Sequence, residues 1–321
     1  MSYTSIVSSH FVLVTGAAGF VGSRITQKLI EQGRKVLALD CFLPNLYSAE
    51  LKRSWKNLDS PNLVKLEFDV RHDNFSMLEP YPIDSIINQA AMPGLAADWS
   101  NFAPYYECNL SALNRLLEFS RKIKINSFIQ ASTSSVYGKR AIGSEDQELN
   151  PTSPYGVSKL AAEKLILAYS DWYSIPAKIL RYFSIYGPNQ RPDMAYAKII
   201  DALLHDQEFN VYGDGEQKRS NTYIDDIVDA TLLAELKAPT ASVLNICGDE
   251  TISLNSAISI LEKHTNRQLK RINSSGRIGD QRDTSGLNSQ AKQLLSWHAR
   301  VGIEEGLLNQ VNAHPLRTIL F

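Results

Sequence analysis

The chain has 321 residues, which is longer than a usual single domain, and its 33 Lys and Arg nearly balance its 34 Asp and Glu. The formal net charge of -1 lacks the positive excess needed to follow a nucleic-acid backbone, so we expect no nucleic-acid partner. The three cysteines are odd in number and form no C-x-x-C pair, which predicts neither a disulfide framework nor a metal site and favours the reducing cytoplasm.

Short apolar strands alternate with helical segments through the first half of the chain. The first strand is predicted at residues 11–15, and its apolar run is too short for a signal peptide or a bilayer span. Later apolar runs are broken by charges or glycines, so no membrane passage is expected. A helix is predicted at residues 23–32, and further strands at 35–39, 63–68, 83–88, 127–131 and 177–181. This alternation predicts the α/β class, with a Rossmann-like, doubly wound parallel sheet.

From about Ser184 the alternation loosens into loops that contain Gly, Pro and Asp. We therefore predict a first domain at residues 1–181 and a smaller C-terminal lobe at residues 182–321. A helix near 222–236 and a strand near 243–247 are expected to return to the first domain, within residues 222–248.

A glycine-rich turn follows the first strand and opens the first helix. Small residues there let backbone N–H groups and the helix N-terminus approach a pyrophosphate, although an isolated glycine motif is often only a tight turn. Support comes from Asp40, which ends the second strand, because a carboxylate there accepts bonds from both ribose hydroxyls and repels a 2′-phosphate. The sequence thus favours NAD over NADP. The residues of this turn predicted to bind the cofactor are Gly16, Gly19, Phe20, Val21 and Gly22.

Tyr155 and Lys159 are four residues apart at the start of a helical segment, so both side chains lie on one helix face. A neighbouring ammonium favours the ionised form of a phenol, which makes Tyr155 the candidate acid/base. The alternative is a surface pair on a solvated helix. However, the helix follows a strand whose carboxyl end carries the hydroxyls of residues 132–135, and ligands of such sheets bind at that edge.

With these motifs in order, nearly the whole sequence resembles the extended short-chain dehydrogenase/reductases, and within them the NAD-dependent nucleotide-sugar epimerases and dehydratases. The resemblance implies a first domain that binds NAD and a C-terminal lobe that binds a UDP-sugar. It implies Thr133, Tyr155 and Lys159 as the catalytic residues, and Asp69, Val70, Ala90, Ala91 and Tyr182 as further cofactor-binding residues, with Tyr155 and Lys159 also touching the cofactor. The substrate-binding residues it implies are Ser134, Ser135, Ser184, Arg191, Tyr212, Arg219 and Arg277.

All of these relatives begin by oxidising the C4 hydroxyl of the sugar, with Tyr155 taking the proton and NAD the hydride. The dehydratases carry Asp-Glu directly after the catalytic Thr, and uronate decarboxylases carry Glu two residues after it. This chain has Ser134 and Ser135 there, and a serine hydroxyl does not replace a carboxyl as acid/base at neutral pH. The remaining chemistry is C4 epimerisation through a transient 4-keto sugar, with a dehydratase as the next alternative.

The sugar itself is less determined. Residues 133–135 and 190–195 most resemble UDP-glucuronate 4-epimerases, in which matching hydroxyls and an arginine surround the C6 carboxylate. UDP-glucuronate to UDP-galacturonate is therefore the first prediction, at even weight with UDP-glucose or UDP-N-acetylglucosamine. Ser134 and Ser135 could instead satisfy local backbone groups, and Arg191 could brace its loop against Asp193.

Two segments depart from the family pattern. The chain has Asn88-Gln89 where relatives have His-Leu, and Ser220-Asn221 where they have Asp-Phe. These changes leave open a protein that binds NAD and UDP-sugar without turnover. The resemblance also implies a homodimer, formed through helices at residues 103–122 and 155–172.

Overall fold

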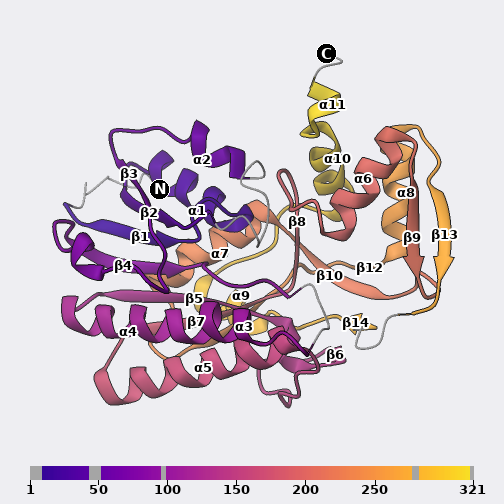
Figure 1. Ribbon diagram of the computed structural model, residues 1–321. Helices are drawn as coiled ribbons and strands as arrows, with labels where there is room; N and C mark the ends of the chain where they lie inside the picture. The colour runs from indigo at the N-terminus through magenta and orange to yellow at the C-terminus, as the bar shows by residue number, and fades with distance from the viewer. Residues whose placement is uncertain (1–8, 43–51, 95–98, 277–281, 319–321) are drawn as a thin grey trace. The chain divides into compact units, whose positions relative to one another are not determined.

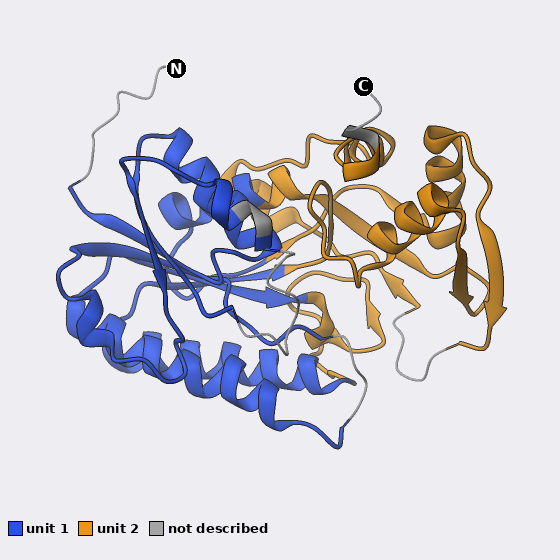
Figure 2. Cartoon of the chain, turned by 45° about the horizontal axis from the view of Figure 1, so that its top comes forward, with its two compact units in different colours: residues 1–133, 153–181, 228–244 blue, residues 134–152, 182–227, 245–321 orange. Residues whose placement is uncertain are grey.

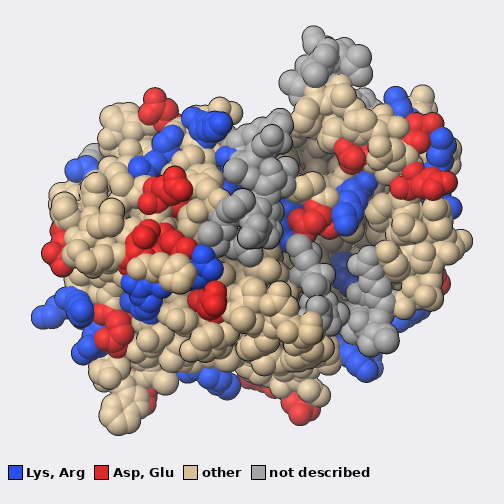
Figure 3. All heavy atoms as spheres, in the orientation of Figure 1, with Lys and Arg blue, Asp and Glu red and all other residues tan. Residues whose placement is uncertain are grey.

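The computed structural model describes residues 9–42, 52–94, 99–276 and 282–318 (Figure 1). It divides into two compact units, coloured separately in Figure 2: residues 1–133, 153–181 and 228–244, and residues 134–152, 182–227 and 245–321. On the face shown in Figure 3, acidic and basic side chains of the first unit are interspersed, as the balanced composition suggests. Within the described residues, no helix has the length and apolar character needed to cross a membrane.

The first unit is built on a seven-stranded sheet with the order β11-β7-β5-β4-β1-β2-β3. Its strands are β1 (Phe11–Thr15), β2 (Lys35–Asp40), β3 (Leu63–Glu67), β4 (Ile83–Asn88), β5 (Ser127–Thr133), β7 (Ala177–Tyr182) and β11 (Val243–Ile246). Its helices are α1 (Phe20–Glu31), α2 (Arg53–Asn57), η2 (Phe75–Leu78), α3 (Ala103–Tyr106), the π-helical turn η3 (Glu107–Ser111), α4 (Ala112–Ile123), α5 (Pro154–Tyr173) and α7 (Ile224–Lys237).

The strand order confirms the predicted fold class. Strand β1 pairs in parallel with β2 on one side and β4 on the other, so the direction of winding reverses between β1 and β4. In such sheets, ligands bind at the carboxyl ends of the strands beside this reversal. The glycine turn follows β1, and residues 89–91 follow β4, so both predicted cofactor segments start at this point.

A hydrophobic core fixes α4 and α5 to one face of the sheet, while α1 and α7 cover the other face (Figure 1). Burying one large apolar side chain contributes about 1.5–3 kcal/mol to the stability of the fold. The fully buried members that join the strands to these two helices include Leu13, Leu37, Ile86, Leu116, Phe128 and Ile166. The core therefore holds α5, which carries Tyr155 and Lys159, firmly against the sheet.

Several element boundaries differ from the sequence-based expectation, and two of them lie at the predicted site. Helix α1 begins at Phe20 and not near Ser23, because Gly19 takes the N-cap position and Gly22 is accommodated within the first turn. Strand β5 continues through Ser132 and Thr133 and does not end at Ala131, because all seven of its residues are buried and the two hydroxyls find room inside the unit.

The second unit contains two smaller sheets. Strands of the first follow the order β12-β10-β14-β6, with β8 also paired to β10, and β9 pairs with β13 in the second. The strands are β6 (Arg140–Ala141), β8 (Ser184–Tyr186), β9 (Glu208–Tyr212), β10 (Lys218–Tyr223), β12 (Thr251–Ser253), β13 (Lys270–Ser274) and β14 (Asp283–Thr284). The helices are η4 (Ser134–Tyr137), α6 (Ala195–His205), α8 (Leu254–Thr265), α9 (Ser289–Leu295), α10 (Ile303–Asn312) and α11 (Pro315–Thr318).

Candidate active site

The turn between β1 and α1 is packed too closely for a side chain at Gly16 or Gly22. Gly16 adopts a positive φ of 63°, which favours glycine. A Cβ atom on Gly22 would lie 2.2 Å from the carbonyl oxygen of Gly16, so only hydrogen fits there. Gly19 is the N-cap of α1 without a side-chain hydrogen bond, and Phe20 and Val21 are the first helical residues. The first N–H groups of the helix can therefore approach an anion.

Asp40 ends β2 beside this turn and is held on both oxygens. Its Oδ2 accepts a hydrogen bond of 2.9 Å from the backbone N–H of Ala18. Its Oδ1 accepts a 3.3 Å bond from the N–H of Phe42 and forms an ion pair with Lys52, an interaction that sequence reasoning missed. Both charged side chains are buried. A carboxylate has about four acceptor positions, and these three donors leave one for a ribose hydroxyl.

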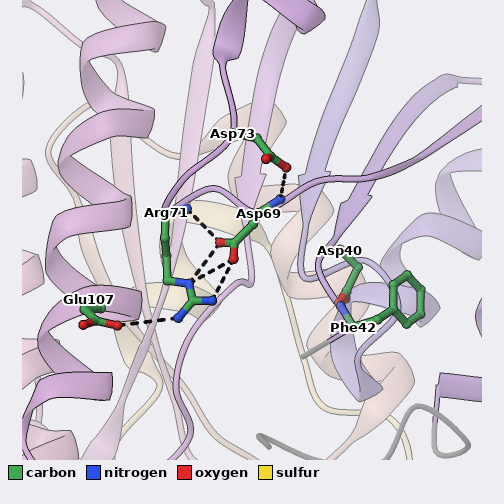
Figure 4. Close-up of polar contacts among 6 residues, drawn as sticks. All are labelled: Asp40, Phe42, Asp69, Arg71, Asp73 and Glu107. Carbon is green, nitrogen blue, oxygen red and sulfur yellow. Dashed lines mark hydrogen bonds and ion pairs between the residues drawn. The ribbon is translucent and has the colours of Figure 1, made fainter. Parts of the chain in front are cut away.

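Asp69 follows β3 and is clamped by Arg71, as Figure 4 shows. The guanidinium donates from Nε at 3.0 Å and from Nη2 at 2.7 Å, and Asp73 accepts the N–H of Asp69 at 2.7 Å. Burial raises the pKa of Asp69, but the hydrogen bonds from Arg71 together outweigh burial and lower it. Arg71 also lies 3.6 Å from Glu107, and Val70 is buried between its two charged neighbours in the chain. Asp69 is thus a fixed, ionised acceptor.

A series of hydrogen bonds between buried polar side chains connects neighbouring strands of the sheet next to the loop that follows β4. Thr15 donates to Asn88 at 2.5 Å, and Asn88 donates to Gln130 at 2.8 Å. The Thr15 hydroxyl also accepts the N–H of Ala90 at 3.2 Å, which fixes the loop that continues to Ala91. Asn88, the departure from the family pattern, therefore serves as a neutral link between β1, β4 and β5.

The three predicted catalytic residues belong to one unit. Thr133 ends β5, and Tyr155 and Lys159 lie in the first two turns of α5, which packs against β5. The helix starts where it does because the Ser153 hydroxyl caps it, accepting the N–H of Gly156 at 3.1 Å. Tyr155 is partly exposed, whereas Lys159 is only 3% exposed.

Lys159 is a buried cation. Within the described part of the chain, no hydrogen-bond acceptor is placed for its ammonium group. Burial lowers the pKa of Lys159 to about 8, and the negative charge of Glu163 acts in the opposite direction. A buried ammonium of this kind is a binding position for polar ligand oxygens.

Asn109, in the π-helical turn η3, is a site residue that the sequence analysis missed. Its amide donates to the Ser158 hydroxyl at 2.8 Å and accepts the N–H of Met92 at 2.8 Å, while Ser158 donates to the carbonyl of Tyr155 at 2.8 Å. A Cβ on Gly94 would lie 2.3 Å from the Tyr155 ring, so the segment 92–94 rests directly on that ring. π-Helical turns often mark functional sites, but no periodicity in the sequence reveals one.

The second unit contains residues predicted for the substrate. Ser134 and Ser135 form the start of η4 directly after Thr133, and Ser134 is buried. Tyr182 ends β7 and is buried, and Ser184 starts β8, where it pairs with Asn221 of β10.

The predicted arginines have different surroundings. Arg191 makes two hydrogen bonds to Asp193, of 3.0 and 2.8 Å, so the bracing interaction is present. Tyr212 ends β9, and Arg219 lies on β10, where it donates to the Lys218 carbonyl at 2.8 Å. Arg277 lies outside the described residues. Among those that are described, no group of His, Cys, Asp and Glu is arranged to hold a metal ion.

The chain is similar to known proteins over most of its length. Over residues 12–247 the chain matches the model of the NAD dependent epimerase/dehydratase family. It is 39% identical to an uncharacterized UDP-glucose epimerase of Bacillus subtilis, YtcB, over 94% of this chain and 96% of that protein. It is 35% identical to a UDP-glucuronate 4-epimerase of Thermodesulfobacterium geofontis, over 94% and 95% of the two chains.

A solved structure agrees over the same length. The UDP-glucuronic acid 4-epimerase of Bacillus cereus, in complex with UDP-glucuronic acid and NAD, is 35% identical and superposes with a TM-score of 0.90. The match covers 97% of this chain and all of that one. The chain therefore belongs to the NAD-dependent epimerase/dehydratase family.

Proposed function

We propose that this protein inverts C4 of the sugar in a UDP-hexose, and that its preferred reaction converts UDP-glucuronate to UDP-galacturonate with NAD as cofactor. The observation that carries the proposal is the pairing on one face of α5 of a partly exposed Tyr155 with the buried ammonium of Lys159. The relatives support it, because two of the three described above are named UDP-glucuronate 4-epimerases.

The first unit suits NAD. The glycine turn packs the N-terminus of α1 closely against the end of β1, Asp40 keeps an acceptor position for a ribose hydroxyl, and Asp69 is a fixed carboxylate that we assign to the adenine side. Bound NAD would accept the C4 hydride and later return it to the other face of a 4-keto sugar. This assignment gives the first unit the cofactor and the second unit the UDP-sugar.

The proton chemistry falls to the residues of α5 and β5. Tyr155 in its phenolate form takes the C4 hydroxyl proton and later returns it, and the Thr133 hydroxyl orients the same oxygen. Lys159 stabilises the phenolate and binds the ribose hydroxyls. Ser134 and Ser135 offer hydroxyls only, so no carboxyl next to Thr133 drives elimination or decarboxylation.

The glycine turn provides a direct test of cofactor binding. Gly22→Ala places a methyl group 2.2 Å from a backbone oxygen, and overpacking of this kind costs about 1–3 kcal/mol. We expect NAD affinity, measured by titration calorimetry, to fall at least about tenfold. Gly276→Ala is the matched control, since Gly276, like Gly22, does not have a positive φ, but a Cβ there has no atom within 4 Å. Equal affinity in the wild type and Gly22→Ala would refute the assignment of this turn.

Arg191 tests the choice of sugar. If it binds the C6 carboxylate, Arg191→Ala removes a charged hydrogen bond worth about 1.5–3 kcal/mol, and kcat/KM for UDP-glucuronate drops about 10- to 100-fold more than for UDP-glucose. Asp193→Asn is the control, because it releases Arg191 from its partner without removing the guanidinium. Equal losses on both sugars would show that the Arg191–Asp193 pair only braces its loop.

The proposal includes a homodimer in the cytoplasm. At the C-terminal ends of α4 and α5, Trp172 is 80% exposed, and the Arg121 guanidinium lies 4.9 Å from the centre of the Tyr173 ring. Such a surface is suited to packing against the same helices of a second copy. The odd number of cysteines fits a reducing compartment. A mass in solution equal to one chain would contradict the dimer.

A further inference from the structure

A buried carboxylate lies one helical turn beyond the predicted catalytic lysine. Glu163 follows Lys159 by four residues on α5, so the two side chains lie on the same face of the helix. Glu163 is only 1% exposed, about as deeply buried as Lys159. None of the steps proposed above uses it.

Two partners from neighbouring strands hold the Glu163 carboxylate. Arg181, near the end of β7, donates from Nε to Oε1 at 3.0 Å and from Nη2 to Oε2 at 2.8 Å. Ser132, which directly precedes Thr133 in β5, donates its hydroxyl to Oε1. Both partners are buried. Glu163 thus links the carboxyl ends of β5 and β7 to the helix that carries Tyr155 and Lys159.

The cluster contains three buried charges in a fixed arrangement. Glu163 stands between two cations: Lys159 on its own helix and Arg181 on β7, whereas β5 contributes only the neutral hydroxyls of Ser132 and Thr133. Tyr155, one turn before Lys159, is the remaining titratable group on this helix face. A buried cation without a counter-charge loses its proton readily. Arg181 cannot lose its proton. If the carboxylate were absent, Lys159 would therefore be the cation that deprotonates.

We propose that Glu163 is a positioning residue of the epimerase reaction, acting as the counter-charge that keeps Lys159 protonated and in place, while Arg181 and Ser132 fix the carboxylate. The inference rests on the proposed function, because it assigns Glu163 a role through Lys159. It is supported by the contacts that fix the carboxylate and by the direction in which Glu163 acts: its charge raises the pKa of Lys159 against burial, and the two effects together leave that pKa at about 8. Loss of the carboxylate charge would bring deprotonation of Lys159 to a lower pH.

The test is Glu163→Gln, which keeps the shape of the side chain and removes its charge. We expect the high-pH limb of the kcat/KM profile for UDP-glucuronate to move down by about one pH unit or more. Glu163→Asp, which keeps the charge, should lower kcat but leave the limb within about half a unit of the wild type. Ser170→Ala is the neutral control and should leave the limb unmoved, because this buried hydroxyl lies near the other end of α5 and donates to the Ile175 carbonyl. A purely structural role predicts instead a loss that does not depend on pH in both Glu163 variants.

A second measurement separates this inference from the proposed function. The titration of Lys159 can be followed by NMR of its ¹³Cε in the full chain, with Lys159→Met to assign the signal, and it requires no turnover. A lower midpoint in Glu163→Gln supports the inference even for an inactive protein, and an unchanged midpoint overturns it even for an active epimerase. If Glu163→Gln leaves Arg181 unpaired and does not fold, the double variant Glu163→Gln/Arg181→Met removes both charges and is read in the same way.

Discussion

Tyr155→Phe is expected to lower kcat by about a thousandfold, within the range attributed to general acid–base catalysis, and to leave NAD affinity nearly unchanged. The variant removes the oxygen that accepts the C4 proton but keeps the ring on which segment 92–94 rests. The glycine turn and Asp40 are untouched. Single-turnover absorbance of NADH after addition of UDP-sugar measures the first effect, and an NAD titration measures the second.

Tyr169→Phe is the matched control for this variant. Tyr169 lies on the same helix, but its hydroxyl donates to Glu118 at 2.8 Å and lies 2.8 Å from the Asn114 side chain, on the side of α5 that faces α4. The same chemical change there should leave kcat within about twofold of the wild type, as for surface sites outside the reaction centre. A Tyr155→Phe variant that retained a tenth of wild-type activity would rule out Tyr155 as the acid/base.

Lys159→Met is expected to abolish activity and at the same time stabilise the fold near neutral pH. The folded-state pKa of Lys159 is about 8, against an ordinary value of 10.5, because burial penalises the charged form. Below pH 8 the wild-type chain therefore bears a destabilisation of up to about 3 kcal/mol, which methionine does not carry. This difference fades as the pH rises from 8 to 10.5, where the lysine becomes neutral in the unfolded chain as well.

The direction of this stability difference is tested by measuring the free energy of unfolding of both proteins with urea, at pH 7 and pH 10.5 and without cofactor. Lys164→Met provides the control, since Lys164 is exposed on the same helix and should change stability by less than about 0.5 kcal/mol. A Lys159→Met variant that is less stable than the wild type at pH 7, or equally more stable at both pH values, would contradict a lysine whose pKa is lowered by burial.

The strands of the first unit could be predicted well because their sequence signal is local. Buried parallel strands are short apolar runs, and β1 and β4 have the bounds that these runs indicate. The pairing of Tyr155 with Lys159 was equally accessible, because a four-residue spacing on a helix determines which side chains share a face. The Arg191–Asp193 interaction was considered for the same reason, since its partners are two residues apart.

The interactions that the sequence did not reveal join residues far apart in the chain. Lys52 reaches Asp40 from the next helical segment, Asn109 reaches Ser158 from a π-helical turn, and Arg181 reaches Glu163 from a neighbouring strand. Each contact depends on how strands and helices pack, and neither hydrophobic periodicity nor a motif encodes that packing. These contacts organise the surroundings of the predicted catalytic residues. The sequence therefore predicts the catalytic residues themselves but not the long-range contacts that hold them in place.

C4 epimerisation is measured by incubating the NAD-loaded protein separately with UDP-glucuronate, UDP-glucose and UDP-N-acetylglucosamine while following the C4 proton by NMR. We expect inversion at C4, fastest for UDP-glucuronate, with no net accumulation of NADH. Binding of NAD and UDP-sugar without inversion of any of the three would contradict it and would identify a protein that holds these ligands without turnover.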